Sequence, residues 1–100
     1  MTRTVTIDAH LALEYPKPTE VITSSHYTLR FGASDEVQAV EVSIDGGPWQ
    51  YCREASGHFW FDWANYMSGR HEIRAKARLK NGHIENAELR FVKIELERWS

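Results

Sequence analysis

The sequence predicts an all-β protein whose strands form a two-sheet sandwich. Apolar and polar residues alternate along most of the 100 residues, whereas the helical period of 3.6 is hard to find. Turn-forming pairs such as Asp45-Gly46 and Asn81-Gly82 separate the alternating runs. Short strands at this spacing, about seven or eight in number and joined by turns, are typical of an antiparallel β-sandwich.

The composition is that of one globular domain. Hydrophobic residues make up 42% and charged residues 26% of the chain, which excludes a disordered protein and supplies enough apolar side chains for a core. The net charge of -2 gives no general attraction to nucleic acid, and no apolar run is long enough to cross a membrane. Cys52 is the single cysteine, so no internal disulfide is expected, and the start lacks the apolar core of a signal peptide. We therefore expect a cytoplasmic protein, with a domain cut from a secreted protein as the alternative.

The N-terminal segment is set apart from the rest of the chain. Residues 5–13 alternate between apolar and polar side chains, which predicts a strand of about ten residues, with a helix over residues 8–15 as the alternative. Pro16-Lys17-Pro18 then predicts a stiff, extended connector. The predicted organisation is an extra N-terminal strand or arm at residues 1–15 and the sandwich at residues 16–100.

A series of strands is expected in the middle of the chain. They cover residues 21–22 (a short edge strand), 27–31, 39–44, 49–53 and 58–63. Val40, Val42 and Ile44 share one face of their strand because successive side chains of a strand point to opposite sides. Asp45-Gly46-Gly47-Pro48 then turns the chain toward the returning strand at residues 49–53.

The strand at residues 70–80 has the clearest alternation. Its predicted core-facing residues are His71, Ile73, Ala75, Ala77 and Leu79, and most residues between them are Arg or Lys. Asn81-Gly82 follows at once and predicts a type I′ hairpin turn.

The return strand, at residues 84–97, carries a break in phase. Ile84 is expected on the core face, yet the next apolar set is one residue out of step, so we expect a bulge near Glu85-Asn86. That set comprises Ala87, Leu89 and Phe91, and it switches again to Val92, Ile94 and Leu96. A strand that changes its apolar face in this way is expected to meet another element or another chain at its far end.

Three segments resemble bacterial immunoglobulin-like domains. They are residues 40–49 (Val-Glu-Val-Ser-Ile-Asp-Gly-Gly-Pro-Trp), 59–63 (Phe-Trp-Phe-Asp-Trp) and 69–77 (Gly-Arg-His-Glu-Ile-Arg-Ala-Lys-Ala), followed by the hairpin glycine Gly82. The resemblance extends over residues 18–95 and implies an immunoglobulin-like two-sheet sandwich. The pattern is also similar to the dimerisation domain of molybdopterin-dependent sulfite oxidases and to accessory domains of glycoside hydrolases. It implies a spacer, a dimerisation surface or a binding module.

The sequence contains no recognisable catalytic or metal-binding motif. No two histidines have the spacing of metal ligands, and His58 and Asp62 would lie about 13 Å apart along a strand. Arg53 is the cationic neighbour of Cys52 and faces away from it, so a reactive thiol is not expected. His71 is expected to hydrogen-bond nearby backbone, as the tyrosine of a tyrosine corner does. We therefore expect neither enzymatic activity nor a bound metal or cofactor.

A row of basic side chains is the main electrostatic feature. It consists of Arg70, Arg74, Lys76, Arg78 and Lys80. Such a stripe could follow a phosphate backbone. Glu85 and Glu88 on the return strand are expected to pair across it, however, which favours a solvated, partly neutralised face over a nucleic-acid site.

The aromatic residues supply the candidate binding site. Phe59, Phe61 and Trp63 share one face of their strand, and Trp60 faces the other way. One interpretation is a core tryptophan with a partly exposed neighbour. The functional interpretation is a flat platform for a sugar ring or a partner chain. The candidate binding residues are Trp49, Tyr51, Trp60, Trp63 and Tyr66.

The function favoured by these patterns is interaction or assembly. Apolar strands at sheet edges offer unpaired backbone groups to a second copy or to another protein. The candidate assembly residues are Val5, Ile7, Leu11 and Leu13 near the start, and Val92, Ile94, Leu96 and Trp99 near the end. The alternative is a carbohydrate-binding or accessory module that uses the exposed aromatic platform. No partner in a membrane is expected.

Overall fold

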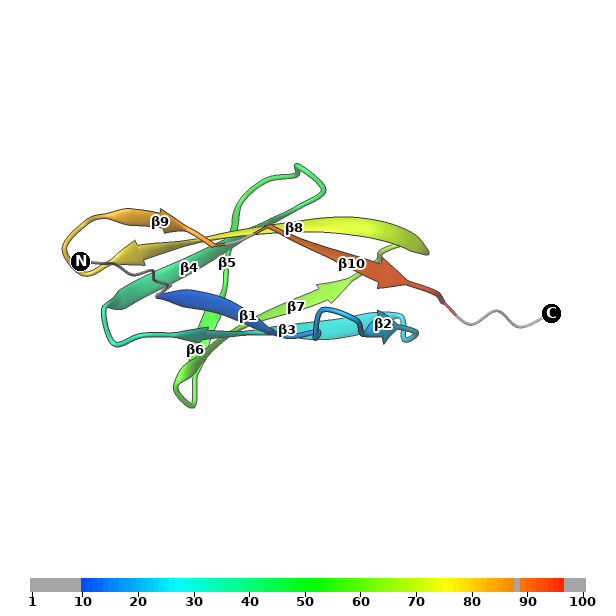
Figure 1. Cartoon of the computed structure of the whole chain (residues 1–100), viewed down its shortest axis with the longest axis horizontal. Coiled ribbons are helices and arrows are strands. Elements are labelled where there is room, and N and C mark those ends of the chain that lie inside the picture. Colours follow the sequence, from blue (N-terminus) through cyan, green and yellow to red (C-terminus); the bar gives the residue numbers. More distant parts are fainter. Residues whose placement is uncertain (1–9, 88, 97–100) are drawn as a thin grey trace, which may run out of the picture.

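The computed structural model describes residues 10–87 and 89–96, which form ten β-strands arranged in two layers (Figure 1). The strands are β1 (Leu11–Tyr15), β2 (Val21–Ile22), β3 (His26–Ala33), β4 (Val37–Ile44), β5 (Gln50–Tyr51), β6 (Arg53–Ala55), β7 (His58–Ala64), β8 (Gly69–Leu79), β9 (Ile84–Asn86) and β10 (Arg90–Ile94). Two of the predicted strands are each divided in two, which accounts for the larger number. The described part of the chain is an all-β sandwich of the immunoglobulin-like class, as predicted.

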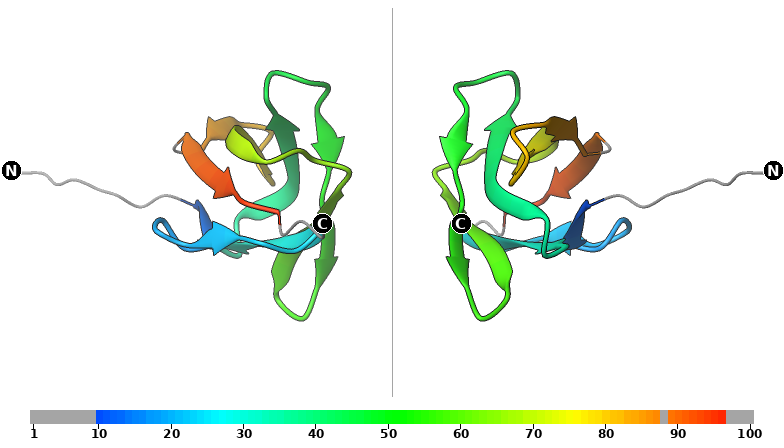
Figure 2. Two further views of the ribbon diagram at one scale, coloured as in Figure 1. Left: turned by 90° about the vertical axis from the view of Figure 1, so that its right-hand side faces the viewer. Right: turned by 90° about the vertical axis from the view of Figure 1, so that its left-hand side faces the viewer.

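The two sheets have different sizes. One sheet has four strands in the order β1-β3-β7-β6, and the other has six, in the order β2-β10-β8-β4-β5 with β9 also paired to β8. Neighbouring strands are antiparallel except β2 and β10, which run parallel, so the expectation of a fully antiparallel sandwich is wrong at this edge. The two views in Figure 2 show the layers edge-on, with β5 and β6 joining them along one side.

The core lies between the sheets and is built from alternate residues of the long strands. Leu29 and Phe31 of β3 and Val40 of β4 have no exposed surface. In β8 the predicted residues Ile73, Ala75, Ala77 and Leu79 are buried. Burial of these apolar side chains is the main stabilising contribution to such a fold.

The hairpin turns differ from those expected. Asp45 and Gly46 both have positive φ angles, as do Ser56 and Gly57, so these two pairs form turns of the I′ kind. At the Asn81-Gly82 pair only Gly82 has a positive φ, and its N–H donates to the Leu79 carbonyl at 2.9 Å. The type I′ prediction is therefore wrong there, and the loop is a three-residue turn closed by a glycine in the left-handed region.

The length of this loop explains the phase of the return strand. The Leu79 N–H donates to the His83 carbonyl, which places Ile84 opposite Arg78. Residues opposite each other point to the same face, so Ile84 faces solvent, where it is 44% exposed, and not the core as expected. A two-residue loop would have placed Ile84 opposite Leu79 and inside.

The expected bulge exists but lies further along the chain. Asn86 is opposite Lys76, whereas Arg90 is opposite Ile73, so the return strand holds one extra residue between β9 and β10 and not at Glu85-Asn86. The insertion turns Val92 and Ile94 toward the core, where they are 4% and 1% exposed. This burial corrects the expectation that Val92 and Ile94 contact another chain.

The chain changes sheets in the middle of the predicted strand 49–53. β5 pairs with β4 and β6 pairs with β7, so Cys52 lies at the point where the chain passes from one sheet to the other. The Cys52 N–H donates to the Val40 carbonyl at 2.9 Å. Burial raises the pKa of the Cys52 thiol to about 12, which disfavours the reactive thiolate.

Within the described residues the N-terminal strand covers Leu11–Tyr15, and it belongs to the sandwich. β1 pairs with β3 at the border of the four-stranded sheet, with Leu11 buried and Leu13 partly buried against the core. The Arg90 guanidinium donates to the carbonyls of Pro16 at 2.9 Å and Leu13 at 3.3 Å, which ties this segment to the opposite sheet. Leu96 is partly buried against the core, and the predicted assembly residues Val5, Ile7 and Trp99 lie outside the described residues.

Candidate interaction surfaces

The structure separates the five aromatic residues that the sequence assigns to one platform. Trp63 is buried, with 7% of its surface exposed, and Tyr66 is partly buried beside it. Trp60 faces outward from the four-stranded sheet, and Trp49 and Tyr51 lie at the β5 side of the six-stranded sheet. The prediction of a single platform is therefore wrong, and Trp63 belongs to the core.

Trp63 is the centre of an aromatic cluster inside the sandwich. Its ring centroid lies 4.5 Å from that of Tyr66 and 5.4 Å from that of His71, which meets it edge-on. The Tyr66 hydroxyl donates to the Ser24 carbonyl at 2.7 Å. These contacts join β7, β8 and the segment before β3, so the cluster is structural.

His71 hydrogen-bonds on both sides of its ring. Nε2 lies 2.7 Å from the Met67 carbonyl oxygen, which confirms the predicted backbone bond, and Nδ1 lies 2.6 Å from an Asp45 carboxylate oxygen. Both partners are acceptors, so the two bonds require a proton on each nitrogen. Burial lowers the pKa of His71, but the bonds to Asp45 and Met67 outweigh it and raise the pKa. For Asp45 the directions are reversed. Burial raises the pKa of its carboxyl group, but the hydrogen bonds from the Glu72 N–H and from His71 outweigh burial, so the pKa is lowered.

The outer face of the six-stranded sheet combines cations with exposed apolar side chains. The register of β8 with β9 and β10 puts Arg70 beside Lys93, Glu72 beside Phe91 and Arg78 beside Ile84. Of the seven exposed large hydrophobic side chains in the described residues, five lie on this face, and a sixth, Tyr51, stands at its β5 edge opposite Glu41. We call it the basic-aromatic face, and its members are Val21, Trp49, Arg70, Arg74, Lys76, Arg78, Ile84, Leu89, Phe91 and Lys93.

Two aromatic rings on this face carry a cation above them. The Arg70 guanidinium lies 4.5 Å from the Phe91 ring centroid, and the Lys76 ammonium lies 4.3 Å from that of Trp49. Each ring borders a shallow depression. One, of about 190 Å³, includes Val21, Arg70 and Phe91, and the other, of about 220 Å³, includes Trp49, Arg74 and Leu89. The face therefore offers apolar recesses with positive charge at their rims.

The expected neutralisation of the basic row by Glu85 is wrong. Glu85 lies opposite Ala77, which is buried, so its side chain is not on the basic-aromatic face. Its carboxylate lies 3.8 Å from His10 instead. Arg74 pairs with Glu72 at 2.6 Å on its own strand, and Glu88 lies outside the described residues.

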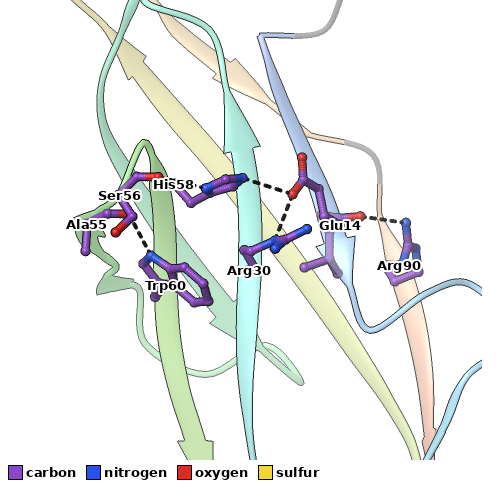
Figure 3. Close-up of polar contacts among 8 residues, drawn as sticks. Glu14, Arg30, Ala55, Ser56, His58, Trp60 and Arg90 are labelled. Carbon is purple, nitrogen blue, oxygen red and sulfur yellow. Dashed lines mark hydrogen bonds and ion pairs between the residues drawn. The ribbon is translucent and has the colours of Figure 1, made fainter.

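A polar network covers the outer face of the four-stranded sheet (Figure 3). Glu14 of β1 accepts a bond from the Arg30 guanidinium at 2.9 Å and lies 3.4 Å from His58. Gly32 leaves room for this carboxylate, because a Cβ there would overlap the Glu14 side chain. The three side chains join β1, β3 and β7, which indicates a role in sheet stability.

A depression of about 220 Å³ lies where β5 and β6 approach β7. Its lining residues are Tyr51, Arg53, Trp60, Phe61 and Asp62. The Trp60 indole N–H donates to the Ala55 carbonyl at 2.9 Å (Figure 3), which holds the ring in place. Tyr51 and Trp60 are thus two members of the predicted platform that line one depression at the surface.

The structure shows no clustered metal ligands in the part of the chain that it describes. Residues 10–87 and 89–96 contain no group of three His, Cys, Asp or Glu side chains able to hold an ion. The same residues include no helix with the length and apolar character needed to cross a membrane.

The comparisons with known proteins concern the fold. No family model and no curated protein matches the sequence. Among solved structures, the endo-β-1,4-mannanase from Thermotoga petrophila aligns with a TM-score of 0.73 and 15% identity over 91% of this chain and 20% of its own. The fibronectin(III)-like modules of Clostridium thermocellum CbhA align with a TM-score of 0.71 and 12% identity over 87% of this chain and 46% of theirs. The chain is an immunoglobulin-like, fibronectin III-like β-sandwich module, and it spans a fifth to a half of these proteins.

Sequence reasoning missed two features of these surfaces. Asp45 was predicted only as a turn residue, although it lies next to His71 in space, 26 positions away along the chain. The exposure of Phe91 was missed because the loop length and the bulge position set its face. A pairing between turn and strand carries no local sequence signal.

Proposed function

We propose that this module is not an enzyme and that it contacts another protein through the basic-aromatic face. The observation that carries the proposal is the concentration of exposed apolar side chains on that face among cations. Exposed apolar patches rimmed by polar groups mark interaction sites. The mannanase and CbhA neighbours support a place for the chain as an accessory module within a larger protein.

Charge decides which partner suits this face. The whole chain has a net charge of -2, yet five cations lie on one surface, where Glu41 and Glu72 compensate only part of their charge: Arg70, Arg74, Lys76, Arg78 and Lys93. Two copies joined by this face would bring like charges together, which is unfavourable. The occupant we propose is an acidic protein segment with aromatic or aliphatic side chains that enter the two recesses.

Charge reversal of the face tests this proposal. The chain is used to select binders from a displayed peptide library, and we expect the enriched peptides to be acidic and to contain apolar anchors. The double variant Arg70→Glu, Lys76→Glu should bind a purified enriched peptide at least ~10-fold more weakly, because charge reversal brings like charges together at two positions of the interface. Fluorescence anisotropy measures the change.

The matched control is Arg53→Glu, which reverses a charge on the other sheet and should leave peptide affinity unchanged. The proposal fails if the enriched peptides lack acidic residues or if charge reversal has no effect. It also fails if the chain binds a single-stranded oligonucleotide and none of the peptides, because the face would then serve nucleic acid.

Self-association through a sheet edge is a second proposal. β1 borders the four-stranded sheet and pairs with β3 on one side, and strand edges of this kind can pair with another chain. We expect light scattering after size-exclusion chromatography to give a multiple of 11.6 kDa. Deleting residues 1–14, which removes most of β1, should lower the number of copies in the assembly. A monomeric full chain, or a mass unchanged by the deletion, would contradict it.

A further inference from the structure

We infer that the depression formed by Tyr51, Arg53, Trp60, Phe61 and Asp62 is a binding site for a neutral saccharide. This site lies at the edge where β5 and β6 approach β7, and Tyr51, opposite Glu41, is the lining residue that borders the basic-aromatic face. It therefore goes beyond the proposed protein contact, and the two can be tested independently.

The aromatic part of the site comes from two strands of different sheets. Tyr51 belongs to β5 and is 67% exposed, and Trp60 belongs to β7, with its indole N–H bonded to the Ala55 carbonyl. The bond fixes the position of the indole ring before any ligand arrives. Exposed rings offer flat apolar faces, and the C–H faces of a pyranose ring are the complementary surface. A preset ring also lowers the entropy cost of binding.

The polar part of the site is also preset. Asp62 accepts bonds from the Thr28 hydroxyl at 2.9 Å and from the Arg53 guanidinium at 3.3 and 3.4 Å. The bonds from Arg53 and Thr28 lower the pKa of Asp62, so the carboxylate stays charged and remains an acceptor. Arg53 has further N–H donors. An acceptor and a donor side by side suit the hydroxyl groups of a sugar.

Charge and size narrow the ligand class. Arg53 and Asp62 compensate each other, so the site has no net attraction for an anionic sugar. The volume of about 220 Å³ is below that of sites for drug-sized ligands, which are typically about 300–1,000 Å³. The site therefore suits one or two rings of a neutral polysaccharide chain, with the rest of the chain in solvent.

Affinity electrophoresis tests the inference with named probes. The full chain is run in native gels that contain galactomannan, xyloglucan or mixed-linkage β-glucan, with polygalacturonate as the acidic comparison. We expect at least one neutral polysaccharide to retard the chain relative to a gel without it. Tyr51→Ala and Trp60→Ala should each weaken the apparent affinity about tenfold, because each removes one of the two rings that contact the sugar. A tenfold change in affinity corresponds to roughly 1.4 kcal/mol.

Trp49→Ala is the matched control, because Trp49 is an exposed aromatic residue that does not line this depression, and it should leave retardation unchanged. If Trp60→Ala fails to fold, the retardation of Tyr51→Ala tests the inference alone. The Tyr51 side chain is largely exposed, so its removal should leave the fold intact. The inference is overturned if no neutral polysaccharide retards the chain or if polygalacturonate alone does so. Retardation that survives both aromatic substitutions overturns it as well. None of these results bears on the charge-reversal experiment at the basic-aromatic face.

Discussion

Replacing Trp63 by alanine is expected to lower the free energy of unfolding by about 3–5 kcal/mol, the usual cost of removing a large buried aromatic side chain. Trp63 is 7% exposed and packs against Tyr66 and His71. A domain of this size has a total stability of roughly 5–15 kcal/mol, so the loss is a large fraction of it. The urea concentration at the unfolding midpoint, followed by circular dichroism, measures the change.

Trp60→Ala is the matched comparison, because Trp60 lies three positions earlier on the same strand and on its opposite face. It loses one hydrogen bond and part of a half-buried ring, so we expect a cost on the order of 1–2 kcal/mol. Equal costs for the two substitutions would contradict the division of the β7 aromatic residues between core and surface.

The ion pair between His71 and Asp45 is expected to make stability depend on pH. The folded-state pKa of His71 is raised, so its contribution to stability is complete below the ordinary histidine value of 6.5 and is lost as the pH rises through the folded pKa. The folded-state pKa of Asp45 is lowered, so its contribution is present above 3.8 and is lost as the pH falls through the folded pKa. The pair therefore stabilises the protein most between these two values.

Asp45→Asn isolates the charge, because asparagine tolerates the positive φ of 53° at this turn position. We expect this variant to lose about 1 kcal/mol at pH 5.5, the low end for a charged hydrogen bond because the carboxylate is half exposed. The loss should shrink as the pH rises through the folded-state pKa of His71, because the imidazole then loses its charge. Urea unfolding at a series of pH values from 5.5 to 9 measures the difference in stability between the variant and the wild type. An equal difference at pH 5.5 and pH 9 would contradict a contribution from the charge of the pair.

Alternation of apolar residues was sufficient to predict the long strands and most of the core. In β3, β7 and β8, and in β4 from Val40 onward, the inward positions follow the period of two, because each strand has one face on the core and one toward solvent. Local chemistry was also sufficient for the turn at Asp45-Gly46, where both residues tolerate positive φ.

The return strand shows where local patterns stop being informative. Ile84 and Phe91 fit either face of a strand, and a single residue in the loop or in a bulge exchanges the faces. The loop after Leu79 holds three residues and the extra residue lies between Asn86 and Arg90, which puts Ile84 and Phe91 outside and Val92 and Ile94 inside. The basic-aromatic face exists because of these two local shifts.

The candidate saccharide site also depends on a feature of the tertiary structure, the change of sheet between β5 and β6. Tyr51 and Trp60 belong to one aromatic-rich region of the sequence, but their meeting requires the chain to leave one sheet at Cys52 and join the other at Arg53. By itself the sequence determined the β-sandwich class, the inward residues of the long strands and the pool of aromatic and basic side chains, because these follow from local periodicity. Only the tertiary structure decided which of those side chains meet and which face solvent, because register, bulge position and the change of sheet are set by contacts between distant strands.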